Sequence, residues 1–442
     1  MRLRGLVQPF RENKKFVNII ESIKKDRFSV GVLGLSESAK SHFVYGLYEE
    51  CNDQIIVVTD NDIEAKKIYE DLSLYIPNVY YFPAMEVVFY NIDAISGDLR
   101  WERIKVIKEM ISKGRKIIVT TIDAFTSFYT PVELYKKYSF SIKIGDSLSL
   151  KELNEKLVLS GYDRVEIVEN KGQFSFRGGI LDLYPPTLRM PYRIEFFGDE
   201  VDSIRTFNAE SQRSIEKVNK IEVFPAKEII LERGNIEAGY EKIKKELGAI
   251  INNIKDDKEK VDKLTNIINA NLENLKETST FETIDSFLSY FYEKPSTFLE
   301  FFKNALIVID DPVRCKGKLE STYYEFEQNY IHFLERADIL PSQGKLLVPK
   351  DELVELLGSS TVVSLSSLNK SGALIEPEYS ETFNEITIGS FGGVLDLFEN
   401  EVRTKKEKGY KVVILCGSRP RGERMANNLR DKGIECSYRD DI

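Results

Sequence analysis

The stretch GVLGLSESAKSHF, residues 31–43, has the outline of a phosphate-binding loop that joins a strand to a helix. Such loops follow the pattern G-x-x-x-x-G-K-[ST], because glycines let the backbone amides approach a phosphate closely. The corresponding positions here are Gly34, Ala39, Lys40 and Ser41. Ala39 stands in the place of the second glycine, and Glu37 adds a carboxylate that costs about 3 kcal/mol at ~5 Å from a phosphate charge. We therefore expect a degenerate loop that hydrolyses no nucleotide, with weak residual binding as the alternative.

Short apolar strands alternate with helical patterns around this loop. Strands are expected at residues 28–35, 54–60, 79–84 and 115–125. Their spacing predicts βαβ units in a parallel sheet, and their nearly continuous apolar character is typical of strands buried on both faces. ALIVIDDP (305–312) is expected to add another buried strand. It ends in Asp310 and Asp311, the position where a nucleotide site needs an acidic group to hold magnesium.

Composition narrows the class of protein. With 442 residues and a formal net charge of −9, the chain is long enough for several domains and carries no global positive field for nucleic acid. Its four cysteines stand singly, which favours a reducing cytosol over a disulfide or zinc framework. No signal peptide and no membrane span is expected. His42 and His332 lie in unrelated contexts, so the sequence predicts no metal site and no catalytic residues.

The pattern changes near residue 147, where one helix is followed by strands joined by turn signals. These features predict a small α+β domain with an antiparallel sheet. In PYRIEFFGDEVDSI (191–204), strand alternation places Arg193, Glu195 and Phe197 on the face opposite the core. Arg177 is expected beside them if the neighbouring strand pairs. An arginine next to an exposed aromatic ring is typical of a protein-interface hot spot, but Phe197 could equally pack under the turn.

Two further regions follow. Residues 236–300 are helical and charged, with an apolar stripe at 3.6-residue spacing formed by Val261, Leu264, Ile267, Ile268, Leu272 and Leu275. From about 350 the chain carries the apparent strands TVVSLS, EITIGS and KVVILCG and the helix PRGERMANNLRDKG. This last part is expected to be a separate small α/β domain.

The runs GQFSFRGGILDLYPP and PYRIEFFGDEVDSIRTF resemble the module shared by the nucleotide-excision protein UvrB and the transcription-repair coupling factor Mfd. FPAMEVVFYNIDAISGDLRWERIKVI is similar to the Mfd form of the preceding domain. The likeness covers residues 1–230 well and continues more weakly to about 315. UvrB has an intact phosphate loop and an aromatic-rich β-hairpin that probes DNA. The degenerate loop, and the lack of room for that hairpin, favour the Mfd family.

The resemblance implies a modular fold of the α/β class. Residues 1–125 and 215–349 would form a degenerate RecA-like domain, 126–214 an inserted α+β UvrA-binding domain, and 350–442 a small α/β domain. The chain would be the N-terminal segment of an ATP-dependent DNA translocase. The ATP and magnesium sites, and the contacts with RNA polymerase and double-stranded DNA, would then lie in the rest of that protein, so this segment would need no cofactor.

The same resemblance places the UvrA-contacting residues at Arg177, Arg193 and Phe197, with Glu195 expected to orient Arg193. The leading hypothesis is an interaction module that recruits UvrA to stalled RNA polymerase in transcription-coupled repair. The alternatives are a UvrB-like, nucleotide-dependent DNA-handling subunit and a scaffold that holds the translocase autoinhibited through intramolecular contacts.

Overall fold

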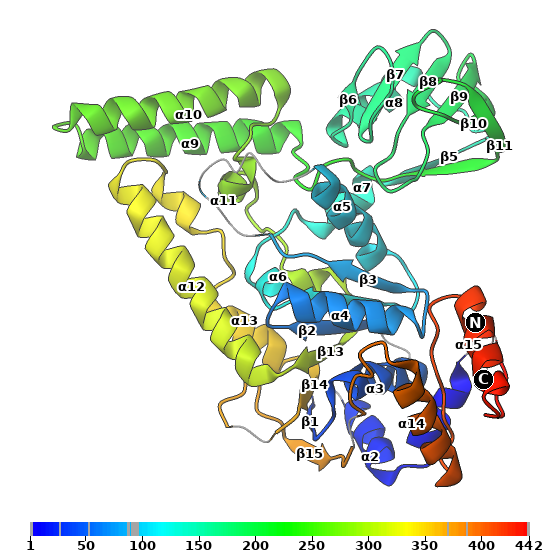
Figure 1. The fold of residues 1–442 in the computed structure, drawn as a ribbon. Coiled ribbons are helices and arrows are strands. Elements are labelled where there is room, and N and C mark those ends of the chain that lie inside the picture. Colours follow the sequence, from blue (N-terminus) through cyan, green and yellow to red (C-terminus); the bar gives the residue numbers. More distant parts are fainter. Residues whose placement is uncertain are drawn as a thin grey trace.

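A parallel sheet organises the computed structural model, which describes residues 3–25, 28–51, 54–85, 89, 97–368, 371–385 and 388–439. Its strand order is β15-β1-β14-β13-β2-β4-β3, and every neighbouring pair is parallel (Figure 1). The strands are β1 (Ser29–Leu33), β2 (Gln54–Thr59), β3 (Val79–Phe82), β4 (Ile117–Thr121), β13 (Ala305–Asp310), β14 (Thr361–Ser366) and β15 (Tyr379–Thr382). The predicted parallel sheet is thus confirmed.

Helices cover both faces of this sheet, which is why its central strands β2, β4, β13 and β14 are mostly apolar and buried. Ile55 and Val57 of β2 pack with the helices of one layer, and Ile56 and Val58 pack with those of the other. The first layer is built from η1 (Arg4–Leu6), α1 (Gln8–Arg11), α2 (Lys14–Ile23), α3 (Glu37–Glu50) and α4 (Asp62–Ser73). The second contains α5 (Gly97–Ile111), α6 (Asp123–Thr126), α7 (Val132–Tyr138), α12 (Pro312–Glu335) and α13 (Lys350–Gly358).

The expected domain boundary at residue 350 is wrong. β14 lies between β1 and β13, and β15 pairs with the other side of β1. Val362 and Val363 are fully buried, one in each core layer. A hydrophobic strand pattern indicates burial but does not name the neighbouring strands, so the sequence alone could not join residues 361–382 to the first sheet.

A second, antiparallel sheet forms the inserted domain, in the order β11-β10-β9-β8-β7-β6, with only β6 and β7 parallel. Its strands are β6 (Asp163–Arg164), β7 (Gln173–Arg177), β8 (Ile180–Leu183), β9 (Tyr192–Phe197), β10 (Glu200–Phe207) and β11 (Ser214–Val218). Leu153 and Leu157 of α8 (Leu150–Leu159) pack on its inner face with Phe174 and Ile194.

The limits of this domain differ from the expected 126–214. The antiparallel pair β5 (Phe140–Lys143) and β12 (Lys220–Val223) connects the domain to the rest of the chain, and both strands contribute to its core. By contrast, Tyr129 and Tyr135 pack in the core of the first sheet. Strand pairing therefore moves both boundaries toward the C-terminus, because β12 returns to close on β5.

The helical region is a hairpin of α9 (Arg233–Asn253) and α10 (Lys258–Thr278), which projects away from the first sheet (Figure 1). Four residues of the predicted stripe are buried within it, namely Leu264, Ile268, Leu272 and Leu275. Short helices connect the hairpin to the body: η2 (Ile284–Phe287), α11 (Leu288–Phe291), η3 (Phe298–Phe301) and η4 (Pro341–Gly344). None of the helices in the described ranges is long and apolar enough to span a membrane.

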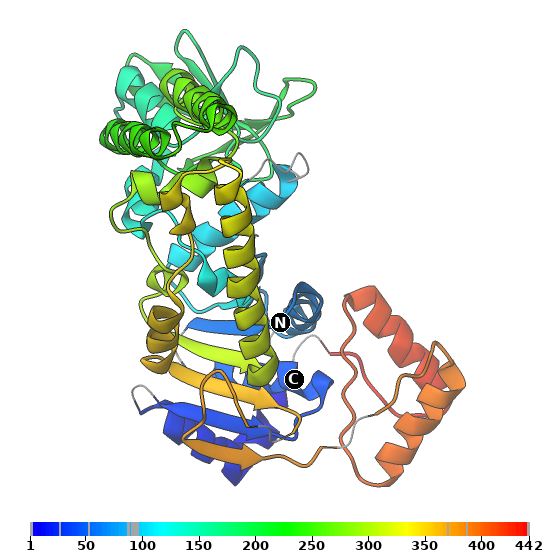
Figure 2. The ribbon, with the colours of Figure 1, turned by 90° about the vertical axis from the view of Figure 1, so that its left-hand side faces the viewer.

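The last described residues lie beside the sheet, where α14 (Leu395–Glu407) and α15 (Arg419–Asp431) pack together (Figure 2). The predicted helix is present as α15. KVVILCG (411–417) is not assigned to a strand, because no neighbour among the described residues pairs with it. EITIGS falls partly outside the described residues, as does the segment between β3 and α5, on which the argument about a missing hairpin depends.

Candidate functional site

Gly34 directly follows β1 and has a positive φ of 78°. A Cβ atom at this position would lie 2.1 Å from the carbonyl oxygen of Phe383, and the Gly34 amide donates to the carbonyl oxygen of Ser366 at 2.9 Å. Both neighbours belong to segments that adjoin β1 in the sheet. The glycine is therefore required by the close approach of the chain's own backbone.

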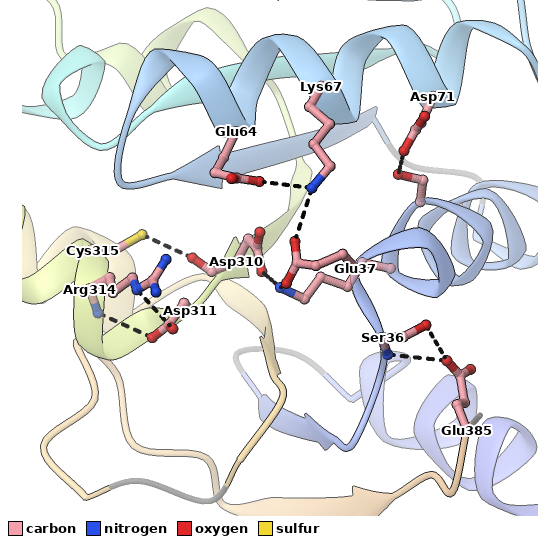
Figure 3. Close-up of polar contacts among 12 residues, drawn as sticks. Ser36, Glu37, Glu64, Lys67, Asp71, Asp310, Asp311, Arg314, Cys315 and Glu385 are labelled. Carbon is pink, nitrogen blue, oxygen red and sulfur yellow. Dashed lines mark hydrogen bonds and ion pairs between the residues drawn. The ribbon is translucent and has the colours of Figure 1, made fainter. Parts of the chain in front are cut away.

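The first turn of α3, which would hold the phosphate of a nucleotide, binds a carboxylate of the protein itself. The backbone N–H and the hydroxyl of Ser36 donate to Glu385 at 3.2 and 3.1 Å (Figure 3). The amide groups at a helix N-terminus attract anions, because they lack partners within the helix and carry the positive end of the helix dipole. In this structure the carboxylate of Glu385 is the anion that binds at the N-terminus of α3.

Lys40 is buried and points at two carboxylates. Its Nζ lies 2.6 Å from Oδ1 of Asp310 and 2.7 Å from Oε1 of Glu37. Burial disfavours the charge on Lys40, but the two carboxylates outweigh it and raise the pKa of this ammonium group. Glu37 also faces Lys67 at 3.6 Å. The lysine that would contact a phosphate is thus neutralised within the protein.

The other residues of the expected nucleotide site do not converge on one ligand. Ser41 donates to Asp71 at 3.4 Å. Asp311 caps α12 by accepting from the backbone of Arg314 at 3.2 Å, whereas Asp310 pairs with Lys40. A cavity of about 310 Å³ remains beside them. Its charged lining consists of the acidic residues Glu37, Asp60, Glu64, Asp310 and Asp311 and the basic residues Lys40, Lys67 and Arg314. This acidic excess opposes a polyphosphate.

Metal binding finds no support at this cavity or elsewhere in the described ranges. No group of three or more histidine, cysteine, aspartate or glutamate side chains has an arrangement that could hold an ion there. Of the two acidic residues expected at the end of the 305–312 strand, Asp310 forms an ion pair with Lys40 and Asp311 caps helix α12.

The outer face of the antiparallel sheet carries the other predicted residues. Alternation along β9 is as expected: Ile194 is buried in the core, while Arg193 and Phe197 lie on the opposite face. Phe197 is 85% exposed at the end of β9, beside the turn at Gly198. It does not pack under the turn, so that interpretation is wrong, and the interface hot spot stays a prediction.

Arg177 and Arg193 meet at one buried carboxylate. Arg193 donates through Nε and Nη2 to the two oxygens of Asp182 at 2.7 and 2.8 Å, and Arg177 donates through Nη2 at 2.6 Å. The guanidinium of Arg193 also stacks over Phe207, 4.8 Å from the ring centroid. The side chain of Arg193 is 18% exposed, and that of Arg177 is 51% exposed. Arg177 and Phe197 are therefore exposed to solvent, whereas the side chain of Arg193 is mostly buried and bound to Asp182.

Sequence reasoning missed Asp182 and Arg205. Arg205 of β10 lies opposite Arg193 and pairs with Glu195 at 3.4 Å. Glu195 also accepts from Ser203 at 2.7 Å, so the residue that orients Arg193 is Asp182 and not Glu195. A usable signal was present in the run ILDL, where a single aspartate stands within an otherwise apolar strand.

Comparison with known proteins adds an independent line of evidence. Residues 140–229 match the family described as the UvrB interaction domain. A transcription-repair-coupling factor of Bacillus subtilis is 31% identical over 98% of this chain and 37% of the relative. Those of Staphylococcus epidermidis and Staphylococcus aureus are 28% identical over 96% and 91% of the chain, which cover 36% and 34% of the relatives.

The chain thus spans little more than a third of the length of these relatives. The matched range begins at β5 and continues past β12, in agreement with the domain limits set by strand pairing. Residues 140–229 thus match the UvrB interaction domain family, within a chain that is similar over nearly all of its length to part of the transcription-repair-coupling factors.

Proposed function

We propose that this chain is a UvrA-docking module, the N-terminal part of a transcription-repair coupling factor that recruits UvrA to stalled RNA polymerase. The observation that carries the proposal is the exposure of Phe197 on β9 and of Arg177 on β7, which share the outer face of the UvrB interaction domain with β8 between them. A phenylalanine held in water on a rigid strand has no role in the core of its own domain. It gains free energy only when a partner covers it.

The chemistry of the surface defines what UvrA would present. Phe197 requires an apolar pocket, and Arg177 requires an acidic or carbonyl acceptor at its rim. Arg193 contributes by holding the face together through Asp182, with Nη1 directed to the backbone oxygen of Gln212 at 3.3 Å. A central aromatic anchor surrounded by arginine is typical of interface hot spots.

We infer that the first sheet is a RecA-like domain that has lost its nucleotide site. Lys40 forms ion pairs with Glu37 and Asp310, and Glu385 accepts from Ser36 at the helix N-terminus. A polyphosphate would have to displace these carboxylates while entering an acidic cavity. The ATP and magnesium chemistry, and the contacts with RNA polymerase and double-stranded DNA, are assigned to the part of the relatives that lies outside this chain. The cytoplasm is the compartment that this role requires.

The same contacts argue against a UvrB-like, nucleotide-driven subunit. That role requires a lysine free to reach a phosphate, whereas Lys40 is held within 2.7 Å of two carboxylates. We expect no ATP turnover by this chain above that of a Lys40→Ala variant in the presence of magnesium. Turnover that depends on Lys40 would replace the docking proposal with the enzymatic one.

Titration of UvrA against the immobilised 442-residue chain tests the proposal directly. Saturable binding is expected, together with its loss in a Phe197→Ala, Arg177→Ala double variant that unfolds at the wild-type temperature. Wild-type affinity in that folded double variant would place the UvrA surface elsewhere.

A further inference from the structure

A cavity of about 710 Å³ lies where three parts of the chain meet. Helix α5 forms one wall, residues 226–229 at the exit of the UvrB interaction domain form another, and residues 274–288 of the helical region form the third. Among the described residues, it shares none of its lining with the cavity beside Lys40. A pocket of this size at a junction between domains is typical of a binding site for a small molecule.

The inner wall of this cavity is apolar. It is formed by buried side chains of α5, of the helical region and of the segment after η4, namely Ile104, Phe281, Leu288 and Leu346. Trp101 of α5 is half-buried and lies close to the UvrB interaction domain, because a Cβ atom at Gly172 would lie 2.9 Å from its indole ring. A ligand that covers this wall and the indole would remove apolar surface from water, which is favourable in proportion to the area buried.

The ionic groups inside the cavity are paired within the protein. Arg103 is 4% exposed and donates through Nε and Nη2 to the two carboxylate oxygens of Glu228 at 2.8 and 2.9 Å. Nζ of Lys227 lies 3.5 Å from Oδ1 of Asp163. None of these four groups requires a counter-charge from a ligand.

The other charged residues of the lining are exposed. Arg100 carries the opposite charge to Glu282 and Asp285, and all three residues are in contact with solvent. In the described ranges, none of the buried side-chain nitrogen or oxygen atoms that lack a hydrogen-bond partner belongs to this lining. A charged ligand would therefore lose its hydration in the cavity without gaining a buried counter-ion. The arrangement favours an uncharged ligand.

We propose that this cavity binds an uncharged molecule with an aromatic body of two rings, which packs between Trp101 and the apolar wall. The ligand would touch α5, the exit of the UvrB interaction domain and the helical region at once. Its binding would therefore stabilise their arrangement and raise the unfolding temperature of the chain. Such a site would operate whether or not the chain binds UvrA.

Three biphenyl probes of the same shape test the preference for an uncharged ligand. Biphenyl-4-methanol is titrated into the 442-residue protein at pH 7.5, in parallel with biphenyl-4-carboxylate and biphenyl-4-methylammonium. The emission of Trp101, which is the single tryptophan of the chain, and the unfolding temperature both report binding. We expect saturable binding of the neutral probe, about tenfold tighter than that of either ion, because burying an unpaired charge is costly.

Two variants test whether the probe occupies the cavity. Thr280→Phe adds a ring to the lining and should abolish saturable binding of biphenyl-4-methanol, because the ring fills the space that the probe needs. Asn252→Phe places the same ring at an exposed position of α9 and should leave the affinity unchanged. Magnetisation transfer in NMR from the probe to the indole N–H of Trp101 locates the ligand without any substitution, and it decides the matter if Thr280→Phe does not fold.

The outcomes are distinct. Saturable binding that favours the neutral probe and is lost in folded Thr280→Phe would support the proposal. Tighter binding of the anion or of the cation would overturn it and assign recognition to Arg100 or to the acidic residues of the lining. Equal affinities for the three probes, an unchanged affinity in folded Thr280→Phe, or no magnetisation transfer to Trp101 would also overturn it.

Discussion

Arg193 and Asp182 lie opposite each other on β9 and β8, and two guanidinium nitrogens of the arginine donate to both oxygens of the carboxylate at 2.7 and 2.8 Å. Asp182 is 1% exposed and also accepts from Arg177. One buried acid therefore positions two arginines of the outer face. Phe197 lies on the same strand as Arg193, so the backbone of β9 places both residues on one face of the sheet.

Replacing Asp182 should damage both stability and binding. Asp182→Asn removes the charge that holds two guanidinium groups, one of them largely buried. Loss of one partner of a buried ion pair typically costs about 3 kcal/mol. We expect a lower urea midpoint and weaker UvrA binding, and we expect no such change for Asp202→Asn, an exposed aspartate on β10. If Asp182→Asn unfolds like the wild type, the carboxylate is not what organises this face.

The Lys40–Asp310 pair should act as a structural element. Lys40→Ala leaves Asp310 buried without its partner and should destabilise the chain by roughly 3 kcal/mol. The double variant Lys40→Ala, Asp310→Ala should lose less than the sum of the single variants, because the two side chains are coupled. Lys67→Ala serves as the control, since its longer contacts at 3.5 and 3.6 Å are solvent-exposed. Additive losses in a urea-unfolding cycle would show that the pair does not stabilise the fold.

His42 should make stability depend on pH. Its Nε2 lies 2.8 Å from the carbonyl oxygen of Leu6, and its ring packs between Phe10 and Tyr75. Burial lowers the pKa of His42, so the unfolded chain binds a proton more readily than the folded one. The stability due to the neutral ring is present above the unfolded pKa, near 6.5, and is lost as pH falls through the lower folded value.

The test of His42 is the change in unfolding free energy between pH 7.5 and 5. His42→Phe keeps the aromatic packing but cannot be protonated, so it should lose less stability over this range than the wild type. His332→Phe, at an exposed position, should follow the wild type. Parallel pH curves for the wild type and His42→Phe would exclude His42 as the source.

Removing β14 should prevent the first sheet from folding. A chain of residues 1–349 lacks the strand that joins β1 to β13, whereas a chain of residues 1–385 retains both β14 and β15. We expect cooperative thermal unfolding of the longer chain only. A cooperative transition of 1–349 with the same midpoint would show that β14 is dispensable.

The sequence predicted local features well and long-range neighbours poorly. Strand alternation correctly placed Arg193 and Phe197 on the outer face, and 3.6-residue spacing identified the buried stripe of α10. Those properties depend on residues close together in the chain. The place of β14 beside β1 depends on contacts between segments more than 300 residues apart, which no local pattern encodes.

At the candidate site, too, the sequence predicted local features but not the partners that come from distant parts of the chain. The pattern at residues 31–43 indicated a degenerate loop, but the presence of Glu385 at its helix N-terminus could not be read from the sequence. In the inserted domain, the sequence predicted that Glu195 orients Arg193, because the two residues share a face. The actual partner is Asp182, a buried residue directly opposite Arg193 in the sheet. Two nitrogens of the guanidinium donate to its two carboxylate oxygens at 2.7 and 2.8 Å.

The most direct measurement is the affinity of UvrA for Phe197→Ala. At 85% exposure the side chain contributes almost nothing to folding, so the thermal unfolding temperature should not change. If Phe197 anchors the interface, its truncation should cost about 2 kcal/mol or more, equivalent to roughly thirtyfold weaker binding. Ile215→Ala, an exposed apolar residue on β11, should bind like the wild type. Undiminished UvrA affinity in folded Phe197→Ala would contradict the account.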